Sequence, residues 1–292
     1  MDGEATCVLD AKATLGEGPV WDDRESVLWW VDIDGCAIHR YDPATDLDTH
    51  CSVGEKVGAA VPRAKGGLVA AVVNGFVEVD FDKASVNPVV DPEAGSNRNR
   101  FNDGKCDPAG RFWAGTMNVD GSGPVGALYR LDADRTVHTM VTGVGTSNGL
   151  AWSTDGDTMY YIDTPTRRVD AFDYDVKTGE IRNRRKVVEI PDGQGYPDGM
   201  SIDDEGKLWV AHWGGWRVAR WDPNTGQKLG EIKLPAAHVT SCAFGGPHRK
   251  TLYITTARTG LNEAGLKEQP LAGGVFAIEL TVSGPPFVPY AG

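Results

Sequence analysis

The sequence of 292 residues lacks the marks of a secreted or membrane protein. Its first residues, Met1-Asp2-Gly3-Glu4, are acidic where a signal peptide is basic, and no apolar run approaches the roughly 18 residues of a membrane span. The five cysteines are odd in number, scattered and without a Cys-x-x-Cys pair, which is typical of reduced intracellular thiols. We therefore expect a cytoplasmic protein with no membrane partner.

Several common chemistries are missing as well. Lys and Arg number 29 against 41 Asp and Glu, and the resulting net charge of −12 repels phosphate backbones, so we expect no nucleic-acid partner. The six histidines show no zinc-ligand spacing, and no Ser-His-Asp arrangement or phosphate loop stands out. No long helical period appears, while the 40% hydrophobic content is enough for a packed core.

What the sequence does contain is a repeat. Six apolar, β-rich runs begin at Leu28, Leu68, Phe112, Met159, Leu208 and Leu252, so successive runs are 40, 44, 47, 49 and 44 residues apart. Five of them are followed by a second alternating segment, at 37–42, 126–132, 168–173, 217–222 and 274–278. A period in the forties with several short strands in each unit predicts an all-β, six-bladed β-propeller, formed as one domain over residues 1–292.

The last repeat is one strand short, because the chain ends near Gly292. The segment 6–11 is strand-like and precedes the first repeat. We expect it to supply the outer strand of the sixth blade, which would close the ring and cover a sheet edge.

A further short segment precedes each apolar run and is predicted to be the innermost strand of its blade. Polar residues lie at matching positions in four of these segments: Glu17 and Asn148 are 11 residues before their runs, and Asn102 and Asp198 are 10 before theirs. Equivalent positions of a radial repeat lie on one ring around the axis, so these four side chains should meet at one mouth of the central channel. Asn-Gly and Asp-Gly turn chemistry is the alternative explanation for each of them singly.

A ring of two carboxylates and two amides predicts a cation site. Oxygen ligands suit Ca²⁺, Mg²⁺ or Mn²⁺, and two negative charges would neutralise a dication. We therefore expect one divalent cation as the cofactor, with its identity open among Ca, Mg, Mn, Zn and Fe.

The same segments resemble the SMP-30/gluconolactonase family, which includes regucalcin and bacterial sugar-acid lactonases. The similarity covers nearly the whole chain and is carried by residues 15–21, 99–105, 147–152, 197–200 and 240–247, with further likeness to regucalcin at 169–175 and 289–292. The resemblance implies a six-bladed propeller with one axial metal and activity as a gluconolactonase-type hydrolase of cyclic esters. It also implies a role in carbohydrate metabolism.

By resemblance, the metal ligands map onto Glu17, Asn148 and Asp198, and Asp198 also maps onto the catalytic acid/base. The substrate contacts map onto Arg100 and Asn102, with Asp120 as the candidate for a further acidic contact in a loop that differs from the family. The expected reaction opens an aldonolactone to the aldonic acid with a metal-activated water. Asp103 is the next candidate for the proton if Asp198 only holds the ion.

Two alternatives remain open from the sequence. One is an organophosphate-hydrolysing propeller with a similar site, and the other is a non-catalytic, calcium-binding regulatory protein. His212, on a predicted strand, is a candidate for the wall of the channel. The partner that we expect is a small sugar lactone, and the expected assembly is a monomer or a weak dimer.

Overall fold

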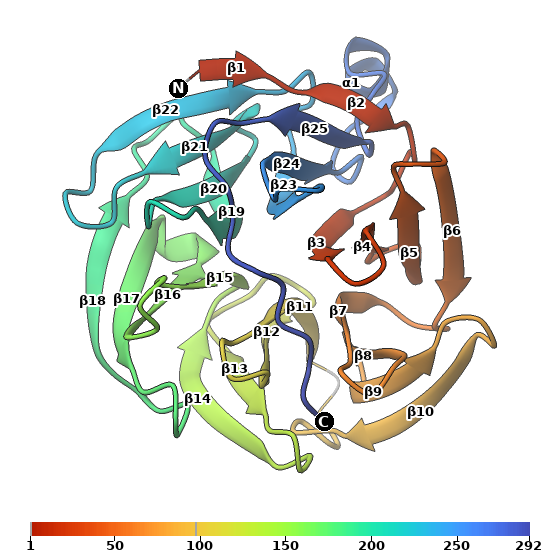
Figure 1. Ribbon diagram of the computed structural model, residues 1–292, viewed down its shortest axis with the longest axis vertical. Coiled ribbons are helices and arrows are strands. Elements are labelled where there is room, and N and C mark those ends of the chain that lie inside the picture. The colour runs from red at the N-terminus through yellow and green to blue at the C-terminus, as the bar shows by residue number, and fades with distance from the viewer. Residues whose placement is uncertain (1, 97) are drawn as a thin grey trace.

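The computed structural model describes residues 2–96 and 98–292. Six small sheets stand around a central axis, each with its innermost strand next to that axis (Figure 1). The predicted six-bladed β-propeller is confirmed. No helix in the described part of the chain is long and apolar enough to cross a membrane.

The first three blades follow the chain in order, and in each the strands run from the axis outward. Blade one contains β3 (Gly16–Asp22), β4 (Val27–Asp32), β5 (Ala37–Asp42) and β6 (Leu47–Ser52). Blade two contains β7 (Val57–Pro62), β8 (Leu68–Val72), β9 (Gly75–Asp80) and β10 (Ser85–Val90). Blade three contains β11 (Asn99–Cys106), β12 (Phe112–Asn118), β13 (Gly126–Leu131) and β14 (Val137–Val144).

The other three blades have the same plan, and blades five and six also include strands from the N-terminus. Blade four contains β15 (Ser147–Trp152), β16 (Thr158–Asp163), the short 3₁₀ helix η1 (Thr164–Thr166), β17 (Arg168–Tyr174) and β18 (Ile181–Glu189). Blade five contains β19 (Tyr196–Ile202), β20 (Leu208–Trp213), β21 (Arg217–Trp221), β22 (Lys228–Lys233) and β1 (Asp2–Glu4). Blade six contains β23 (Val239–Gly245), β24 (Thr251–Thr256), the helix α1 (Glu263–Glu268), β25 (Val275–Glu279) and β2 (Thr6–Leu9).

The N-terminus closes the ring, and it does so in two blades. β2 pairs antiparallel with β25 as the outermost strand of blade six, which confirms the predicted closure. β1 adds a further strand that pairs parallel with β22 of blade five. The sequence pattern did not indicate this second pairing, because three residues are too few to show a strand period. Together the two strands cover the outer edges of neighbouring blades.

The core consists of apolar layers between neighbouring blades. Side chains alternate along each strand, so successive residues face opposite neighbours. On β4, for example, Trp29 and Val31 pack toward blade two, while Leu28 and Trp30 pack toward blade six. Six such layers are present in the described chain, one at each blade boundary. This packing leaves the inner strands as the walls of the central channel.

Candidate functional site

Bulges in the inner strands place polar side chains near the axis. Each of the six inner strands shifts its register once against the second strand of its blade. The shift follows Glu17 in β3 and Asn148 in β15, and in β19 it spans Asp198. A bulge inserts residues that the partner strand does not match, and it redirects their side chains. The predicted polar positions therefore coincide with the places where pairing is interrupted.

Glycine follows the polar residue in these bulges because the inner strands approach each other closely. A Cβ on Gly149 would lie 2.8 Å from the carbonyl oxygen of Asp198, and one on Gly199 would lie 2.1 Å from Ser241 Oγ. Only glycine leaves enough room for the neighbouring inner strand at these points. The Asn-Gly and Asp-Gly pairs thus serve packing around the axis as well as local backbone geometry.

The carboxyl groups of Glu17 and Asp198 are buried side by side. Only 3% of Glu17 and 6% of Asp198 is exposed. Burial raises the pKa of Glu17 well above its usual range, and the charges of Asp198 and Asp103 raise it further. Burial also raises the pKa of Asp198, with the charge of Asp103 adding to the effect. Two buried carboxylates in contact repel each other, so a positive charge between them would stabilise their ionised forms.

Asn148 presents a free oxygen to this pair. Its Nδ2 donates to Thr164 Oγ1 at 3.0 Å, and Thr164 Oγ1 donates to the carbonyl oxygen of Pro197 at 2.8 Å. These bonds fix the amide, while the buried Oδ1 has no hydrogen-bond partner among the described residues. An unpaired buried oxygen is unfavourable unless a ligand satisfies it.

Two carboxylates and one amide oxygen fit a hard divalent cation, which prefers oxygen ligands. No group of three or more His, Cys, Asp or Glu side chains within residues 2–96 and 98–292 is arranged to hold a metal ion. The fit therefore depends on the amide of Asn148 together with Glu17 and Asp198.

Asp103 belongs to the same cluster, although the spacing of the repeats pointed to its neighbour Asn102. Its side chain is 4% exposed, and its charge raises the pKa values of both Glu17 and Asp198. Burial raises the pKa of Asp103 itself, and Lys105 opposes that rise. Asp103 is followed by Gly104, just as the three ligand candidates are followed by glycine. The glycine that follows each of these polar residues is the sequence signal that points to this third acid.

Arg100 and Asn102 form a polar unit next to the carboxyl groups. An Nη of Arg100 donates to Asn102 Oδ1 at 2.8 Å and to the carbonyl oxygen of Phe101 at 2.9 Å, while Asn102 Nδ2 donates to the carbonyl oxygen of Ser147 at 2.8 Å. Burial lowers the pKa of Arg100, and the charges of Asp34, Glu17 and Asp198 oppose that change. Asn102 thus holds the guanidinium group in place, and its Oδ1 and Nδ2 each retain capacity for one further hydrogen bond.

Among the described residues, neither Asp120 nor His212 forms a hydrogen bond or ion pair with this cluster. Asp120 is exposed in the loop after β12, and its backbone N–H donates to Asn118 Oδ1 at 2.7 Å. His212 is fully buried in blade five, where its Nδ1 lies 2.7 Å from the carbonyl oxygen of Gln194 and its ring stacks on Trp221. Burial lowers the pKa of His212 to about 4. His212 thus packs within its blade opposite Pro197, and its buried Nε2 has no hydrogen-bond partner among the described residues.

Comparison with known proteins identifies the relatives of this chain. Residues 15–258 match the model of the SMP-30/Gluconolactonase/LRE-like region. The chain belongs to the SMP-30/gluconolactonase family. This finding confirms the resemblance that the sequence motifs indicated.

Two curated relatives of the SMP-30/gluconolactonase family align along almost their whole length. Regucalcin of Danio rerio is 45% identical over 289 residues, covering 98% of both chains. A Bacillus subtilis protein named "putative sugar lactone lactonase" is 40% identical over 289 residues, covering 99% of both chains. Such relatives support lactone hydrolysis as the general activity of this chain.

Solved structures of the family agree with the fold. A luciferin-regenerating enzyme superposes with a TM-score of 0.92 at 35% identity, covering 98% of this chain and 99% of that one. A regucalcin of Agrobacterium tumefaciens, described as a calcium-binding protein, superposes with a TM-score of 0.94 at 25% identity, covering 99% of this chain and 98% of that one. The whole described ring therefore has the architecture of its family.

Proposed function

We propose that this chain hydrolyses a sugar lactone to the open sugar acid at the axial cluster of Glu17, Asn148 and Asp198, with one divalent cation as cofactor. The observation that carries the proposal is the pairing of two buried carboxyl groups with the unsatisfied Oδ1 of Asn148. Relatives named as lactonases supply the substrate class. Glu17, Asn148 and Asp198 would hold the cation, which would polarise the lactone carbonyl and acidify a bound water.

Asp198 is the proposed acid/base. Its carboxyl group contacts Glu17 and Asn148, and its pKa is already raised by burial. A carboxylate that accepts the proton of the attacking water can return it to the ring oxygen as the ester C–O bond breaks. Glu17, whose Oε2 accepts from the backbone N–H of Gly18 at 2.8 Å, is held in one orientation and acts as a ligand only.

Arg100 and Asn102 are the proposed contacts to substrate. Among the described residues, the two hydrogen bonds of the Arg100 guanidinium group both come from one nitrogen. The N–H groups of its other nitrogens remain free to donate to sugar hydroxyl groups or to the carbonyl oxygen of the lactone. Asp120 is the proposed additional contact from the exposed loop after β12. A sugar lactone, which carries many hydroxyl groups, is complementary to such a mixture of donors and acceptors.

The test is a panel of aldonolactones assayed by acid release, with the spontaneous rate subtracted. Chelated protein should hydrolyse no lactone above background, and adding back Ca²⁺, Mg²⁺, Mn²⁺ or Zn²⁺ singly should restore activity. A phosphotriester in the same panel tests the organophosphate alternative. Full activity after chelation, in protein that elemental analysis shows to be metal-free, would refute the metal-dependent reaction. A protein that binds Ca²⁺ but hydrolyses nothing would favour a regulatory role.

A further inference from the structure

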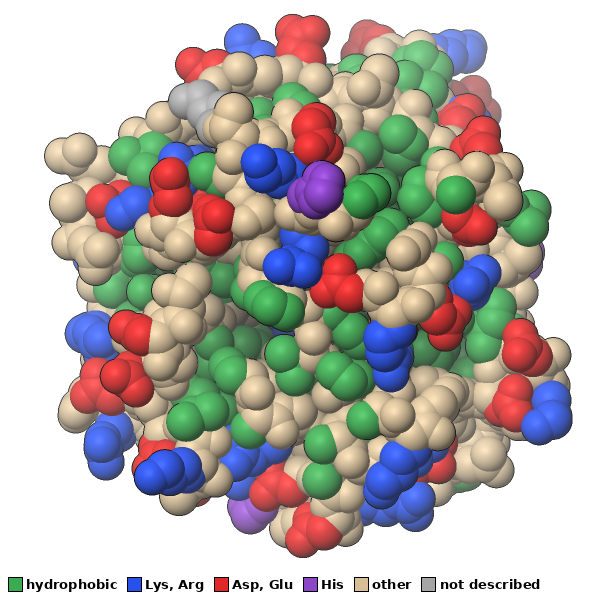
Figure 2. All heavy atoms as spheres, in the orientation of Figure 1, with side chains coloured by type: hydrophobic (Ala, Val, Ile, Leu, Met, Phe, Trp, Pro, Cys, Tyr) green, Lys and Arg blue, Asp and Glu red, His purple; other side chains and the backbone are tan. Residues whose placement is uncertain are grey.

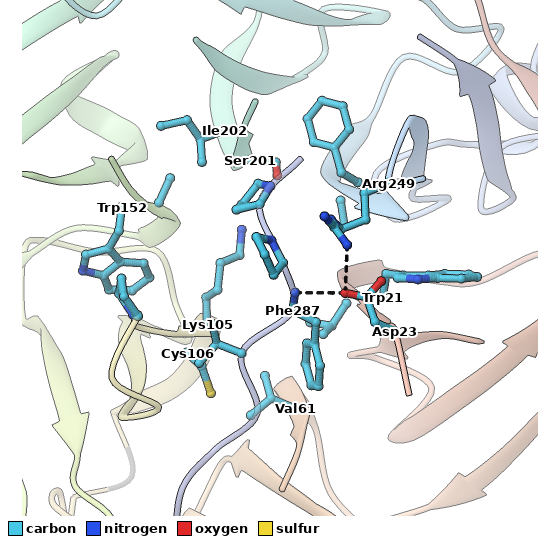
Figure 3. Close-up of a pocket in the computed structure, with 18 of the residues that line it drawn as sticks. Trp21, Asp23, Val61, Lys105, Cys106, Trp152, Ser201, Ile202, Arg249 and Phe287 are labelled. Atoms are coloured by element: carbon cyan, nitrogen blue, oxygen red, sulfur yellow. Dashed lines mark hydrogen bonds and ion pairs between the residues drawn. The ribbon is translucent and has the colours of Figure 1, made fainter. Parts of the chain in front are cut away.

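A cavity lies at the mouth of the central channel that is remote from the carboxyl cluster. It has a volume of about 320 Å³, within the lower range of small-molecule pockets. Its walls come from the ends of the inner strands that are remote from the carboxyl cluster, and they are mostly apolar. Trp21, Trp152, Ile202 and Phe244 are among the lining residues (Figure 3). Hydrophobic side chains also gather around the centre of this face (Figure 2).

The C-terminal segment crosses this mouth as a strap, which we define as residues 283–292 (Figure 1). At one end, the backbone N–H of Gly284 donates to the carbonyl oxygen of Arg249 at 2.8 Å. At the other end, Tyr290 is buried, its N–H donates to the carbonyl oxygen of Pro62 at 2.9 Å, and its hydroxyl donates to the carbonyl oxygen of Asp132 at 2.7 Å. The strap is therefore tied to both sides of the ring.

Between these ties the strap has few attachments. The backbone N–H of Phe287 donates to Asp23 Oδ2 at 3.2 Å, and Arg24 lies over the Phe287 ring. Asp23 also pairs with Arg249 at 3.7 Å, so the two opposite charges at the rim compensate each other. The middle of the strap thus forms a mostly apolar cover over the cavity, between the two ties.

Lys105 extends into this cavity from β11 (Figure 3). Its Nζ donates one hydrogen bond, to the carbonyl oxygen of Met200 at 2.6 Å. It forms no direct ion pair with any carboxylate of the described residues; burial lowers the pKa of Lys105, and the charge of Asp103 opposes that change. An ammonium group has three donors and is costly to hold in an apolar environment without an anionic partner. The cavity therefore combines aromatic walls with one incompletely satisfied cation.

We propose that this cavity is a second binding site, separate from the lactonase site, for a small carboxylate with an apolar or aromatic body. The carboxylate would accept hydrogen bonds from Lys105, and the body would lie between Trp152 and Trp21 beneath Phe287. A neutral apolar molecule would fill the same cavity and contact the same walls, but it would leave the ammonium group of Lys105 without an anionic partner. The proposal does not depend on the reaction assigned to the carboxyl cluster.

The probe pair is hydrocinnamate and its neutral analogue hydrocinnamyl alcohol, titrated calorimetrically into the full-length protein. Hydrocinnamate should bind about tenfold or more tightly than the alcohol, the usual effect of a hydrogen bond to a charged group. An excess of aldonate, which is the product of the proposed lactonase reaction, should not compete. Competition by aldonate, or equal affinity for the two probes, or no binding of either, would overturn the proposal.

Variants locate the binding. Lys105→Met should remove the preference for hydrocinnamate, and Lys105→Arg should retain most of it because the positive charge remains. Ala243→Leu narrows the cavity and should weaken both probes by about tenfold or more, since added methylene groups displace the ligand body. Thermal melting checks that each variant folds. If Lys105→Met fails to fold, unchanged binding to Ala243→Leu still suffices to refute the site.

Discussion

The two ends of the same inner strands have opposite chemistry. At one end, Glu17, Asp103 and Asp198 are buried acids with raised pKa values. At the other end, Lys105 lines a cavity whose walls are mostly apolar. Only one residue of β11, Gly104, separates Asp103 from Lys105.

The difference follows from how the strands pair. At the acidic end each inner strand is bulged, so its side chains turn out of the interblade layers. Beyond the bulge the pairing is regular: Trp21 is opposite Leu28, and Trp152 is opposite Met159. Regular alternation directs large apolar side chains into the layers between blades. A repeated fold can thus separate a polar site from an apolar cavity along one channel.

Among the substitutions that distinguish the two ends of the channel, removal of the proposed acid/base should have the largest effect on lactone hydrolysis. Asp198→Asn retains an oxygen ligand and nearly the same shape, but it cannot accept the proton. At saturating metal its kcat for lactone hydrolysis should fall by about 10²–10⁴, the usual contribution of a positioned acid or base. Glu17→Gln under the same conditions should retain more of its kcat, because Glu17 acts only as a ligand.

A substitution in the apolar cavity, at the other end of the channel, is the control for effects that reach the acidic cluster from a distance. Ala243→Leu should leave lactone kcat unchanged, because Ala243 lines the opposite cavity. Recovery of wild-type kcat by Asp198→Asn at saturating metal would reduce Asp198 to a ligand. Asp103→Asn would then be the variant to test for the proton transfer.

The sequence predicted the fold in detail because its signals were repeated six times. Blade boundaries and inner strands depend on patterns that recur along the chain, and the N-terminal closure follows from the sixth repeat being one strand short. The pairing of β1 with β22 was missed, since this strand of three residues occurs once and lies parallel to its neighbour. Non-repeated contacts give no period to detect.

The site was predicted less completely. Repeat spacing located Glu17, Asn148 and Asp198, which the structure brings together. It located Asn102 at the matching position of blade three, and the structure adds the neighbouring Asp103 to the buried acidic cluster, because both residues lie in the same bulge. The Asn148–Thr164 bond, which leaves Oδ1 unsatisfied, joins β15 to the 3₁₀ helix η1 and could only be found in the structure.

His212 tests whether a buried polar group at the acidic end serves packing alone. The pKa of His212 is lowered from an ordinary 6.5 to about 4 in the folded protein. Between these two pH values, the unfolded chain therefore binds a proton at His212 more readily than the folded protein does. Its stabilising contribution is thus complete above about pH 6.5 and is lost as the pH falls toward about 4, by up to about 3 kcal/mol. His212→Asn should reduce this pH dependence of the unfolding free energy, measured by denaturant titration, without changing lactone kcat at neutral pH. An unchanged slope would show that other groups dominate.

Arg100→Ala tests the substrate contact with a smaller expected effect. Loss of a charged hydrogen bond of about 1.5–3 kcal/mol should lower kcat/KM about tenfold to somewhat over a hundredfold. Metal affinity should be kept. Arg100→Lys retains the charge but not the planar fork that Asn102 Oδ1 holds, so it should recover only part of the loss. Kinetics indistinguishable from wild type would place Arg100 outside the site.

Asp120 has the smallest expected effect, because it is exposed and its carboxylate lies outside the buried cluster. A charge in such a position interacts weakly, by about 0.2–1 kcal/mol, so Asp120→Asn should raise KM by no more than about fivefold. Raising the salt concentration should reduce even this difference, since exposed charges are screened. Asp120→Glu is the matched control, because it keeps the charge and lengthens the reach. An increase in KM well above tenfold that persists at high salt would contradict this expectation, and it would mean that the loop after β12 closes onto the substrate beside Arg100.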